Sequence, residues 1–217
     1  MNQSTFPYRL YLVTDQASCL GRNFFWVVEE ALKGGVDIVQ IREKSLPLED
    51  FIRKAEQLKA ICKKYQVPLI INDSVKVAKI VDAEGLHVGQ EDANIKEAKA
   101  ILGSSKTLGL SLENMEDLRK PYCEDAWYYG VSPIYATPTK KDTKSEWGLE
   151  GLANLRNATD KPLVAIGRVN LDNAANIISH GADCLAVVSG ICSAPSPAHA
   201  AEALRKKIEE GLNHQSW

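Results

Sequence analysis

Three polar side chains spaced two residues apart could bind an anion. Gln40, Arg42 and Lys44 belong to the stretch QIREK at 40–44. Alternate residues of an extended chain point to the same side, so this stretch would present two cations and an amide on one face. Such a face could contact a phosphate or diphosphate. The same spacing also fits a solvated strand end with surface salt bridges, and the residues alone leave both interpretations open.

Two aspartates follow successive predicted strands. Asp73 comes directly after Asn72, and Asp92 closes the stretch GQED at 89–92. Neighbouring strand ends would bring these carboxylates close together, as a magnesium ion shared between protein and substrate phosphate requires. Each aspartate alone could instead be a helix cap, because a predicted helix follows each of them.

Hydroxyl, cationic and glycine residues gather in three further segments. The stretch 133–143, PIYATPTKKDT, is dense in donors that suit phosphate, although a basic surface loop would look similar. Gly167 and Arg168 follow one late strand, and Val188, Ser189 and a glycine follow the last. Late loops of this kind often bind phosphate in barrel enzymes.

His87 lies inside a predicted strand, where we expect a core imidazole and assign it no role.

These candidates depend on a regular alternation of strands and helices. Short β-branched runs predict eight strands, at 8–14, 36–41, 67–71, 85–89, 106–110, 126–131, 162–167 and 184–188. Helical patterns are expected between and after them, at 24–33, 48–64, 75–81, 94–102, 113–120, 149–157, 171–180 and 197–211. Several strand runs are apolar at almost every position, which is typical of parallel strands covered on both faces.

The alternation predicts an α/β fold, a single (β/α)₈ TIM barrel with eight parallel strands. The 217 residues allow about 27 per unit, near the small end for this fold. An open doubly wound sheet is the alternative, but VTDQASCLG follows the first strand in place of a G-x-G-x-x-G motif. No linker or low-complexity segment interrupts the series, so we expect one domain over 1–217.

Composition excludes several classes of protein. Twenty-six Lys and Arg against 28 Asp and Glu give a net charge of −2, too little for a broad field that binds nucleic acid or an anionic membrane. The five cysteines form no C-x-x-C pair and are odd in number, which indicates a reducing compartment. The unbroken apolar runs are short, so we expect neither signal peptide nor membrane span and a cytoplasmic location. The sequence leaves open whether copies assemble into a homo-oligomer.

Eight short motifs in order resemble the thiamine-phosphate synthase family. They span most of the chain, from about Tyr8 to Ile208, and each alone is weak. The motifs are YLVTD (11–15), QIREK (40–44), IND (71–73), HVGQED (87–92), GLS (109–111), PIYATPTKKDT (133–143), VAIG (164–167) and AVVSGI (186–191). The resemblance implies a (β/α)₈ enzyme that joins 4-amino-5-hydroxymethyl-2-methylpyrimidine diphosphate to 4-methyl-5-(2-phosphoethyl)thiazole, giving thiamine phosphate and pyrophosphate.

The resemblance also implies roles for individual residues. Asp73 and Asp92 would hold Mg²⁺, and Arg42, Lys44 and Lys140 would be the catalytic cations at the diphosphate. The family's substrate contacts fall here on Gln40, Ile41, Arg42, Glu43, Lys44, Asn72, Ser111, Thr137, Pro138, Thr139, Lys140, Gly167, Arg168, Val188 and Ser189. The family mechanism is dissociative: pyrophosphate leaves first, and the thiazole nitrogen attacks the resulting pyrimidine methyl cation. Such a reaction needs charge stabilisation and positioning more than a protein base.

Two positions depart from the family pattern. Arg168 stands where a second glycine is usual, and it would be strained if its φ is positive. Leu112 and Glu113 follow Ser111 where many members have small or hydroxyl residues and a histidine. A related thiazole tautomerase is one rival function, but it would need a histidine base there and no metal carboxylates. A non-catalytic barrel that binds a thiamine precursor is the other.

Overall fold

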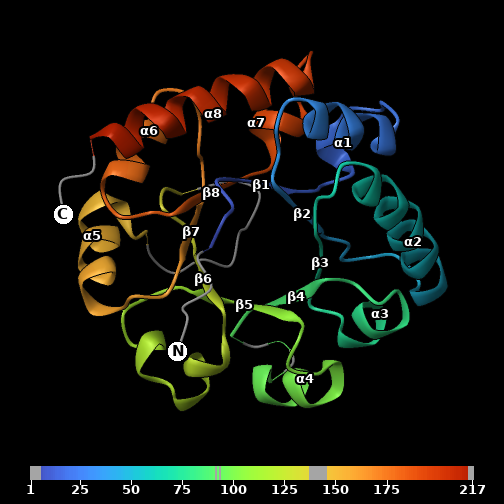
Figure 1. Ribbon diagram of the computed structural model, residues 1–217, viewed down its shortest axis with the longest axis horizontal. Coiled ribbons are helices and arrows are strands. Elements are labelled where there is room, and N and C mark those ends of the chain that lie inside the picture. The colour runs from blue at the N-terminus through green and yellow to red at the C-terminus, as the bar shows by residue number, and fades with distance from the viewer. Residues whose placement is uncertain (1–5, 91, 93, 137–145, 215–217) are drawn as a thin grey trace.

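Eight parallel strands close into a barrel in the described part of the chain, which is residues 6–90, 92, 94–136 and 146–214 of the computed structural model (Figure 1). Each strand pairs with its neighbours in chain order, and β8 pairs with β1 to close the ring. The strands are β1 (Leu10–Val13), β2 (Ile38–Ile41), β3 (Leu69–Asn72), β4 (Gly85–Val88), β5 (Thr107–Leu112), β6 (Tyr128–Val131), β7 (Leu163–Ile166) and β8 (Cys184–Val187). The predicted barrel is confirmed.

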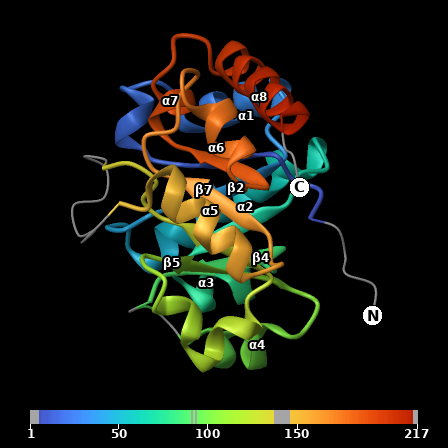
Figure 2. The same ribbon diagram turned by 90° about the vertical axis from the view of Figure 1, so that its left-hand side faces the viewer.

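Helices surround the strands on the outside of the barrel (Figure 1). They are α1 (Phe24–Lys33), α2 (Leu48–Lys64), α3 (Val75–Ile80), α4 (Ile95–Leu102), α5 (Gly148–Ala158), α6 (Ala174–Ser179), α7 (Ser189–Cys192) and α8 (Pro197–Asn213). Helix α8 packs against both α6 and α1, so the last helix lies beside the first (Figure 2).

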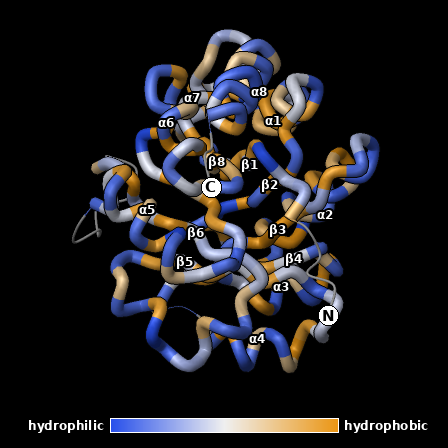
Figure 3. The backbone as a smooth tube through the Cα atoms, turned by 60° about the vertical axis from the view of Figure 1, so that its left-hand side comes forward, coloured by the Kyte–Doolittle hydropathy of each residue, from blue (hydrophilic) through white to orange (hydrophobic). Residues whose placement is uncertain are grey.

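Alternation along the strands separates two apolar clusters. In β1, Leu10 and Leu12 join the cluster between strands and helices, whereas Tyr11 and Val13 join the cluster inside the barrel. The helices add one apolar stripe each, as in α2, where Phe51 and Leu58 are among the buried residues. Hydrophobic and hydrophilic residues accordingly alternate along the chain trace (Figure 3).

One predicted helix is wrong. The stretch 113–120 contains no α-helix and instead leads into two 3₁₀ turns, Asp117–Arg119 and Pro121–Asp125. The Asn114 side chain accepts hydrogen bonds from the backbone nitrogens of Glu116 (2.9 Å) and Asp117 (3.1 Å), which offers the backbone a turn in place of a helix. Pro121 then starts the second turn, because proline cannot continue a helix begun before it.

A short helix that the sequence did not predict, α7, directly follows β8.

Among the described residues, no helix is long and apolar enough to cross a membrane. The five cysteines are buried thiols without a disulfide.

Candidate active site

Two adjoining cavities open at the carboxyl ends of the strands, the end at which barrel enzymes carry their active sites. The smaller has a volume of about 140 Å³ and the larger about 410 Å³. The same five residues form part of the wall of both: Val13, Arg42, Ser132, Ile166 and Ala186. Two ligands bound here would therefore lie next to each other.

A pair of carboxyl groups lies in the smaller cavity. Asp73 directly follows β3 with a φ of 61°, a left-handed conformation that aspartate adopts more readily than most residues. Its Oδ2 accepts hydrogen bonds from Lys44 Nζ (2.5 Å) and Asn72 Nδ2 (2.5 Å). Asp92 Oδ2 accepts a hydrogen bond from the backbone nitrogen of Gly89 (2.8 Å). These contacts direct both carboxyl groups into one cavity.

The two carboxyl groups perturb each other's pKa. Burial and the hydrogen bond with Asp92 raise the pKa of Asp73, against the opposing effect of Lys44. Burial also acts to raise the pKa of Asp92, but the hydrogen bonds with Asp73 and Gly89 lower it overall. Each carboxyl group disfavours ionisation of the other, so the group that gives up its proton less readily is Asp73.

The pair fits a divalent cation. A hard cation such as Mg²⁺ binds carboxylate oxygens and relieves the repulsion between them, and it commonly takes its other ligands from water and substrate phosphate. No group of three or more His, Cys, Asp or Glu side chains in the described residues could hold a metal ion. Two protein carboxylates with remaining positions for phosphate oxygens match the way Mg²⁺ is usually held.

Two cations stand beside this carboxyl pair. Arg42 borders both cavities, and its backbone nitrogen donates to Thr14 Oγ1 (3.2 Å) at the end of β1. Lys44 lines the smaller cavity through its contact with Asp73. Glu43, which lies between them in the sequence, forms an ion pair with Lys54 of α2, at 2.5 Å between Oε1 and Nζ. The alternation predicted from QIREK therefore places both cations, but not Glu43, at the cavity.

A chain of hydrogen bonds crosses the barrel interior beneath the smaller cavity. Gln40 Nε2 donates to the Tyr11 hydroxyl (3.0 Å), which lies 3.0 Å from the Tyr128 hydroxyl. Tyr128 in turn contacts His87 Nδ1 (3.0 Å), and His87 Nε2 contacts Ser111 Oγ (2.9 Å). The chain thus joins five strands and ends on two predicted substrate contacts, Gln40 and Ser111.

Glycines make room for this chain. A Cβ at Gly109 would overlap the Tyr128 ring and hydroxyl, and it would lie 2.5 Å from His87 Nδ1. A Cβ at Gly130 would lie 2.8 Å from His87 Cε1. Only a residue without a side chain lets the imidazole and phenol rings pack across the strands at these two positions.

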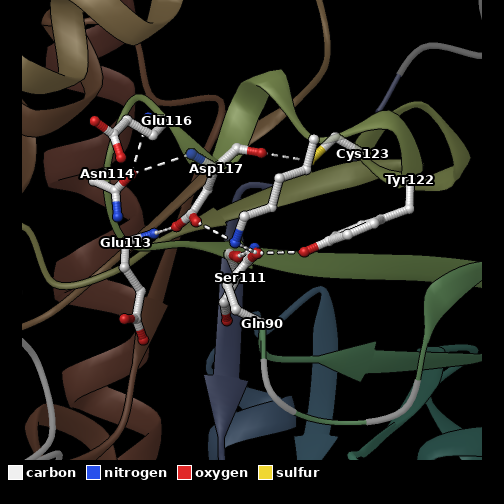
Figure 4. A network of polar contacts seen from close by, with 9 residues as sticks. Gln90, Ser111, Glu113, Asn114, Glu116, Asp117, Tyr122 and Cys123 are labelled. Carbon is white, nitrogen blue, oxygen red and sulfur yellow. Dashed lines mark hydrogen bonds and ion pairs between the residues drawn. The ribbon is translucent and has the colours of Figure 1, made fainter.

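Gln90 lies just after β4, and its side chain links β5 to the segment that follows β5 (Figure 4). Its Nε2 donates to the carbonyl oxygen of Ser111 (2.5 Å), and its Oε1 accepts from Lys120 Nζ (2.7 Å) and the Tyr122 hydroxyl (2.9 Å). Lys120 also pairs with the buried Asp117 at 2.8 Å. Because Gln90 lies between Gly89 and Asp92, this network holds the aspartate's segment against β5.

The larger cavity is bordered by the ends of β7 and β8. Its wall includes Gly167, Arg168, Val188 and Ser189. Gly167 has a φ of 119° and lies against Pro133 and Ile134, so a side chain there would be both strained and obstructed. Arg168 has a φ of 55°, which is the positive value that makes this departure from glycine strained.

Comparison with known proteins identifies the family. The family model described as thiamine monophosphate synthase matches residues 10–191. The chain belongs to this family. The predicted resemblance is thereby confirmed.

Relatives over nearly the whole chain agree with this assignment. Thiamine-phosphate synthase of Albidiferax ferrireducens is 46% identical over 201 residues, covering 93% of this chain and 92% of that protein. The synthase of Leptospira biflexa is 45% identical over 203 residues, with 92% and 97% covered. A solved structure, thiamine phosphate pyrophosphorylase from Pyrococcus furiosus, has a TM-score of 0.86 at 33% identity and covers 94% of this chain and 97% of that one. Homology at this level identifies this family member as an enzyme of thiamine biosynthesis, a transferase with thiamine-phosphate synthase activity.

The structure brings most of the predicted site residues of this synthase-family chain together. Gln40, Arg42, Lys44, Asn72, Asp73, Asp92 and Ser111 line the smaller cavity, and Arg42, Gly167, Arg168, Val188 and Ser189 line the larger one. Ile41 is fully buried in the outer apolar cluster, and neither it nor Glu43 is among the residues that line the two cavities. Four further predicted residues, Thr137, Pro138, Thr139 and Lys140, lie outside the described residues.

The prediction missed the three residues that link Gln40 to Ser111 in the hydrogen-bond chain. His87 was expected to be a core imidazole without a role, and Tyr11 and Tyr128 were not singled out, yet each lines the smaller cavity of this synthase-family barrel. The available signal was alternation: in β1 and β6, Tyr11 and Tyr128 occupy the inward-facing positions. A polar group at an inward position of a barrel strand needs a buried partner, so alternation could have marked Tyr11 and Tyr128 as polar interior residues, although not which residues they contact.

Proposed function

We propose that the smaller cavity binds the pyrimidine diphosphate and the larger cavity the thiazole phosphate. One observation carries this assignment: the Asp73 and Asp92 carboxyl groups lie with Arg42 and Lys44 in a cavity that shares a wall with a second one. The reaction joins two small phosphorylated molecules, and it needs a diphosphate site directly beside a site for the second ring. The two adjoining cavities meet this requirement, because the carboxyl pair and Lys44 line the smaller cavity and not the larger one.

Asp73 and Asp92 would hold Mg²⁺ together with oxygens of the diphosphate. When bound, Mg²⁺ would neutralise charge on the leaving pyrophosphate. Asn72 and Gly89 donate hydrogen bonds that fix the two carboxyl groups, and Lys44 limits the negative charge of the metal-free pair.

The protein's cations would stabilise charge on the departing diphosphate. Arg42 reaches both cavities, so its guanidinium is suited to a diphosphate bound at their border. Lys44 and, by family resemblance, Lys140 would add two further positive charges. Bond breaking in the pyrimidine substrate leaves a methyl cation that the thiazole nitrogen attacks, so the protein's main tasks are to position the rings and to stabilise charge.

Gln40 and Ser111 would hold the pyrimidine ring, because both line the smaller cavity below the carboxyl pair. Gly167, Arg168, Val188 and Ser189 would surround the thiazole phosphate in the larger cavity. Thr137, Pro138 and Thr139 are proposed as phosphate contacts on family resemblance alone. Ile41 and Glu43 are proposed as substrate contacts on the same ground.

The test is a coupled assay with both substrates and Mg²⁺. We expect thiamine phosphate and pyrophosphate in equal amounts, with no turnover when either substrate or Mg²⁺ is left out. Tight binding of one precursor without turnover would instead support a precursor-binding barrel. Isomerisation of a thiazole phosphate without the pyrimidine substrate would support a tautomerase.

We also propose that residues 1–217 form one domain and that the enzyme acts in the cytoplasm. The five buried thiols are consistent with a reducing compartment. A homo-oligomer is possible, and light scattering after size-exclusion chromatography distinguishes it from a monomer of 23.9 kDa.

A further inference from the structure

The hydrogen-bond chain inside the barrel links the two groups proposed to touch the pyrimidine. Its members are Gln40, Tyr11, Tyr128, His87 and Ser111, with successive contacts of 3.0, 3.0, 3.0 and 2.9 Å. Tyr11 and Tyr128 are fully buried, and Gln40 is 4% exposed. Buried groups of this kind must satisfy one another, so a proton at one end constrains every other proton in the chain.

The Gln40 end fixes the direction of the chain. The Gln40 amide nitrogen can only donate, so the Tyr11 oxygen accepts and the Tyr11 proton is directed to Tyr128. Directing the Tyr128 proton to His87 Nδ1 gives every proton of the chain an acceptor, and it leaves Nδ1 unprotonated. The proton of the neutral imidazole therefore lies on Nε2 and is donated to Ser111 Oγ. With its oxygen accepting from His87, Ser111 turns its own proton toward a ligand.

We propose that Tyr11, Tyr128 and His87 are positioning residues that select an aminopyrimidine by orienting these protons. The oriented chain makes Ser111 a donor. Because the Gln40 amide nitrogen donates to Tyr11, its carbonyl oxygen is the acceptor that Gln40 offers a ligand in the cavity. This inference rests on the proposed function of the smaller cavity.

A 4-aminopyrimidine matches this arrangement of donor and acceptor. Its ring nitrogen beside the amino group accepts a hydrogen bond, and the amino group donates one. The 4-oxo analogue presents the reverse, a ring N–H donor beside a carbonyl acceptor. Binding it would leave two donors facing each other and two acceptors facing each other, or would require all the protons of the chain to reverse.

Burial keeps the two phenols of the chain in their neutral form. Burial raises the pKa of Tyr11 and raises that of Tyr128 well above its usual value. Neither phenol ionises in the ordinary pH range, so each keeps the proton that passes the direction along. The close fit at Gly109 and Gly130 also holds the imidazole and phenol rings in contact.

Nitrogen NMR of ¹⁵N-histidine-labelled protein tests the direction without substrate. We expect His87 to show a protonated Nε2 and an unprotonated Nδ1 at neutral pH. Substituting Gln for the other imidazoles, His180, His199 and His214, leaves the His87 signals alone in the spectrum. A proton on Nδ1, or an equal mixture of the two tautomers, would overturn the proposal whether or not the enzyme makes thiamine phosphate.

Binding of two pyrimidines tests the selection. Tyr128→Phe removes the proton donated to His87 with little change of shape, and Tyr129→Phe is the matched control. The Tyr129 hydroxyl donates to the carbonyl oxygen of Cys123 (3.0 Å), outside the chain. Affinity for the 4-oxo diphosphate is measured as competitive inhibition, because its own reactivity differs from that of the 4-amino substrate.

We expect Tyr128→Phe to reduce the preference for the 4-amino over the 4-oxo compound about tenfold, the scale of one lost hydrogen bond of ~1.4 kcal/mol. Tyr129→Phe should keep the wild-type preference. Tyr11→Phe should act like Tyr128→Phe, and it replaces that variant if Tyr128→Phe does not fold. An unchanged preference in a folded Tyr128→Phe or Tyr11→Phe protein would overturn the proposal. Absence of turnover in the wild type would overturn the proposed function instead.

Discussion

At the scale of single residues, Asp92 is the group whose charge can be removed with least disturbance. Asparagine has the same shape, and its oxygen can still accept the hydrogen bond from the Gly89 backbone nitrogen. We expect Asp92→Asn to lower Mg²⁺-dependent kcat/KM by about 10²–10³-fold, the usual cost of one preorganised electrostatic group. Steady-state rates across a Mg²⁺ titration measure this effect.

Asp82→Asn is the control for that substitution. Asp82 lies before β4, at the amino end of the strands, and its side chain is 76% exposed beside Lys106. Its rates should match the wild type. If Asp92→Asn also kept wild-type rates at every Mg²⁺ concentration, Asp92 would have no place in the metal site.

The carboxyl pair also predicts a pH dependence of Mg²⁺ affinity. Burial and Asp92 raise the pKa of Asp73, so protons should compete with Mg²⁺ at a higher pH than for an ordinary aspartate. We expect affinity, measured by calorimetry with pyrophosphate present, to weaken as the pH falls through this raised pKa. Affinity that stays constant from neutral pH down to the usual aspartate pKa would contradict it.

The same shift has a defined sign for stability. In the folded metal-free protein, ionised Asp73 is less favourable than in the unfolded chain, because its folded pKa is the higher one. This cost is complete above the raised pKa, falls as the pH drops below it, and is gone below the ordinary aspartate pKa of the unfolded chain. Asp73→Asn should therefore unfold with less pH dependence in that window.

Single residues differ in how far sequence predicts them. The spacing of Gln40, Arg42 and Lys44 predicted a shared side, and all three line the smaller cavity although only Gln40 lies within β2. His87 was not predictable as part of the site, since its partners Tyr128 and Ser111 are 41 and 24 residues away. Which distant polar groups meet inside a barrel depends on strand register, and no local pattern encodes it.

At the scale of elements, Gln90 joins the segment after β4 to the connection between β5 and β6 (Figure 4). Gln90→Ala would remove partners of Ser111, Lys120 and Tyr122 together. We expect the free energy of unfolding in urea to fall by about 1–3 kcal/mol, the scale for leaving partly buried polar groups unsatisfied. Mg²⁺ affinity should fall as well, because Asp92 lies two residues away.

Gln57→Ala is the matched control for Gln90→Ala. Gln57 lies on α2 and is exposed, so its loss should change stability by less than ~0.5 kcal/mol. Equal stability of the two variants would show that the Gln90 contacts do not hold the segment.

Element boundaries were predictable where one pattern dominated. The helix expected at 48–64 is α2, Leu48–Lys64, because apolar residues recur there at threes and fours without a competing turn residue. The helix expected at 113–120 failed because Asn114 and Pro121 favour turns.

At the scale of the whole molecule, ligand binding should stabilise the barrel. Mg²⁺ and pyrophosphate would bind residues from β2, β3 and the segment after β4, and only the folded state brings these together. At 100 times Kd, such binding contributes about 2.7 kcal/mol. For a domain of this size we expect the Tm to rise by about 5–10 °C in thermal unfolding.

A chelator should remove that rise, and pyrophosphate without Mg²⁺ should give a smaller one. Asp92→Asn should lose most of the Mg²⁺-dependent part. An equal rise in Asp92→Asn and wild type would mean that the ion pairs with pyrophosphate away from this site.

The barrel as a whole was predictable because the strands recur in order with α-helices after all but one of them, and closure follows from their number and parallel direction. The division of the barrel mouth into two cavities was not predictable from the sequence. It depends on where Ser132, Ile166 and Ala186 project relative to Arg42, and that is decided by packing across strands.

The shared wall of the two cavities makes their occupants thermodynamically linked. A shift of the Arg42 side chain toward a molecule in one cavity also changes the contacts that this side chain makes in the other cavity. By reciprocity, the factor by which the first occupant alters the affinity for the second must equal the factor in the opposite direction. A substitution in this wall therefore acts on both equilibria, and selection on either substrate's affinity is constrained by the other.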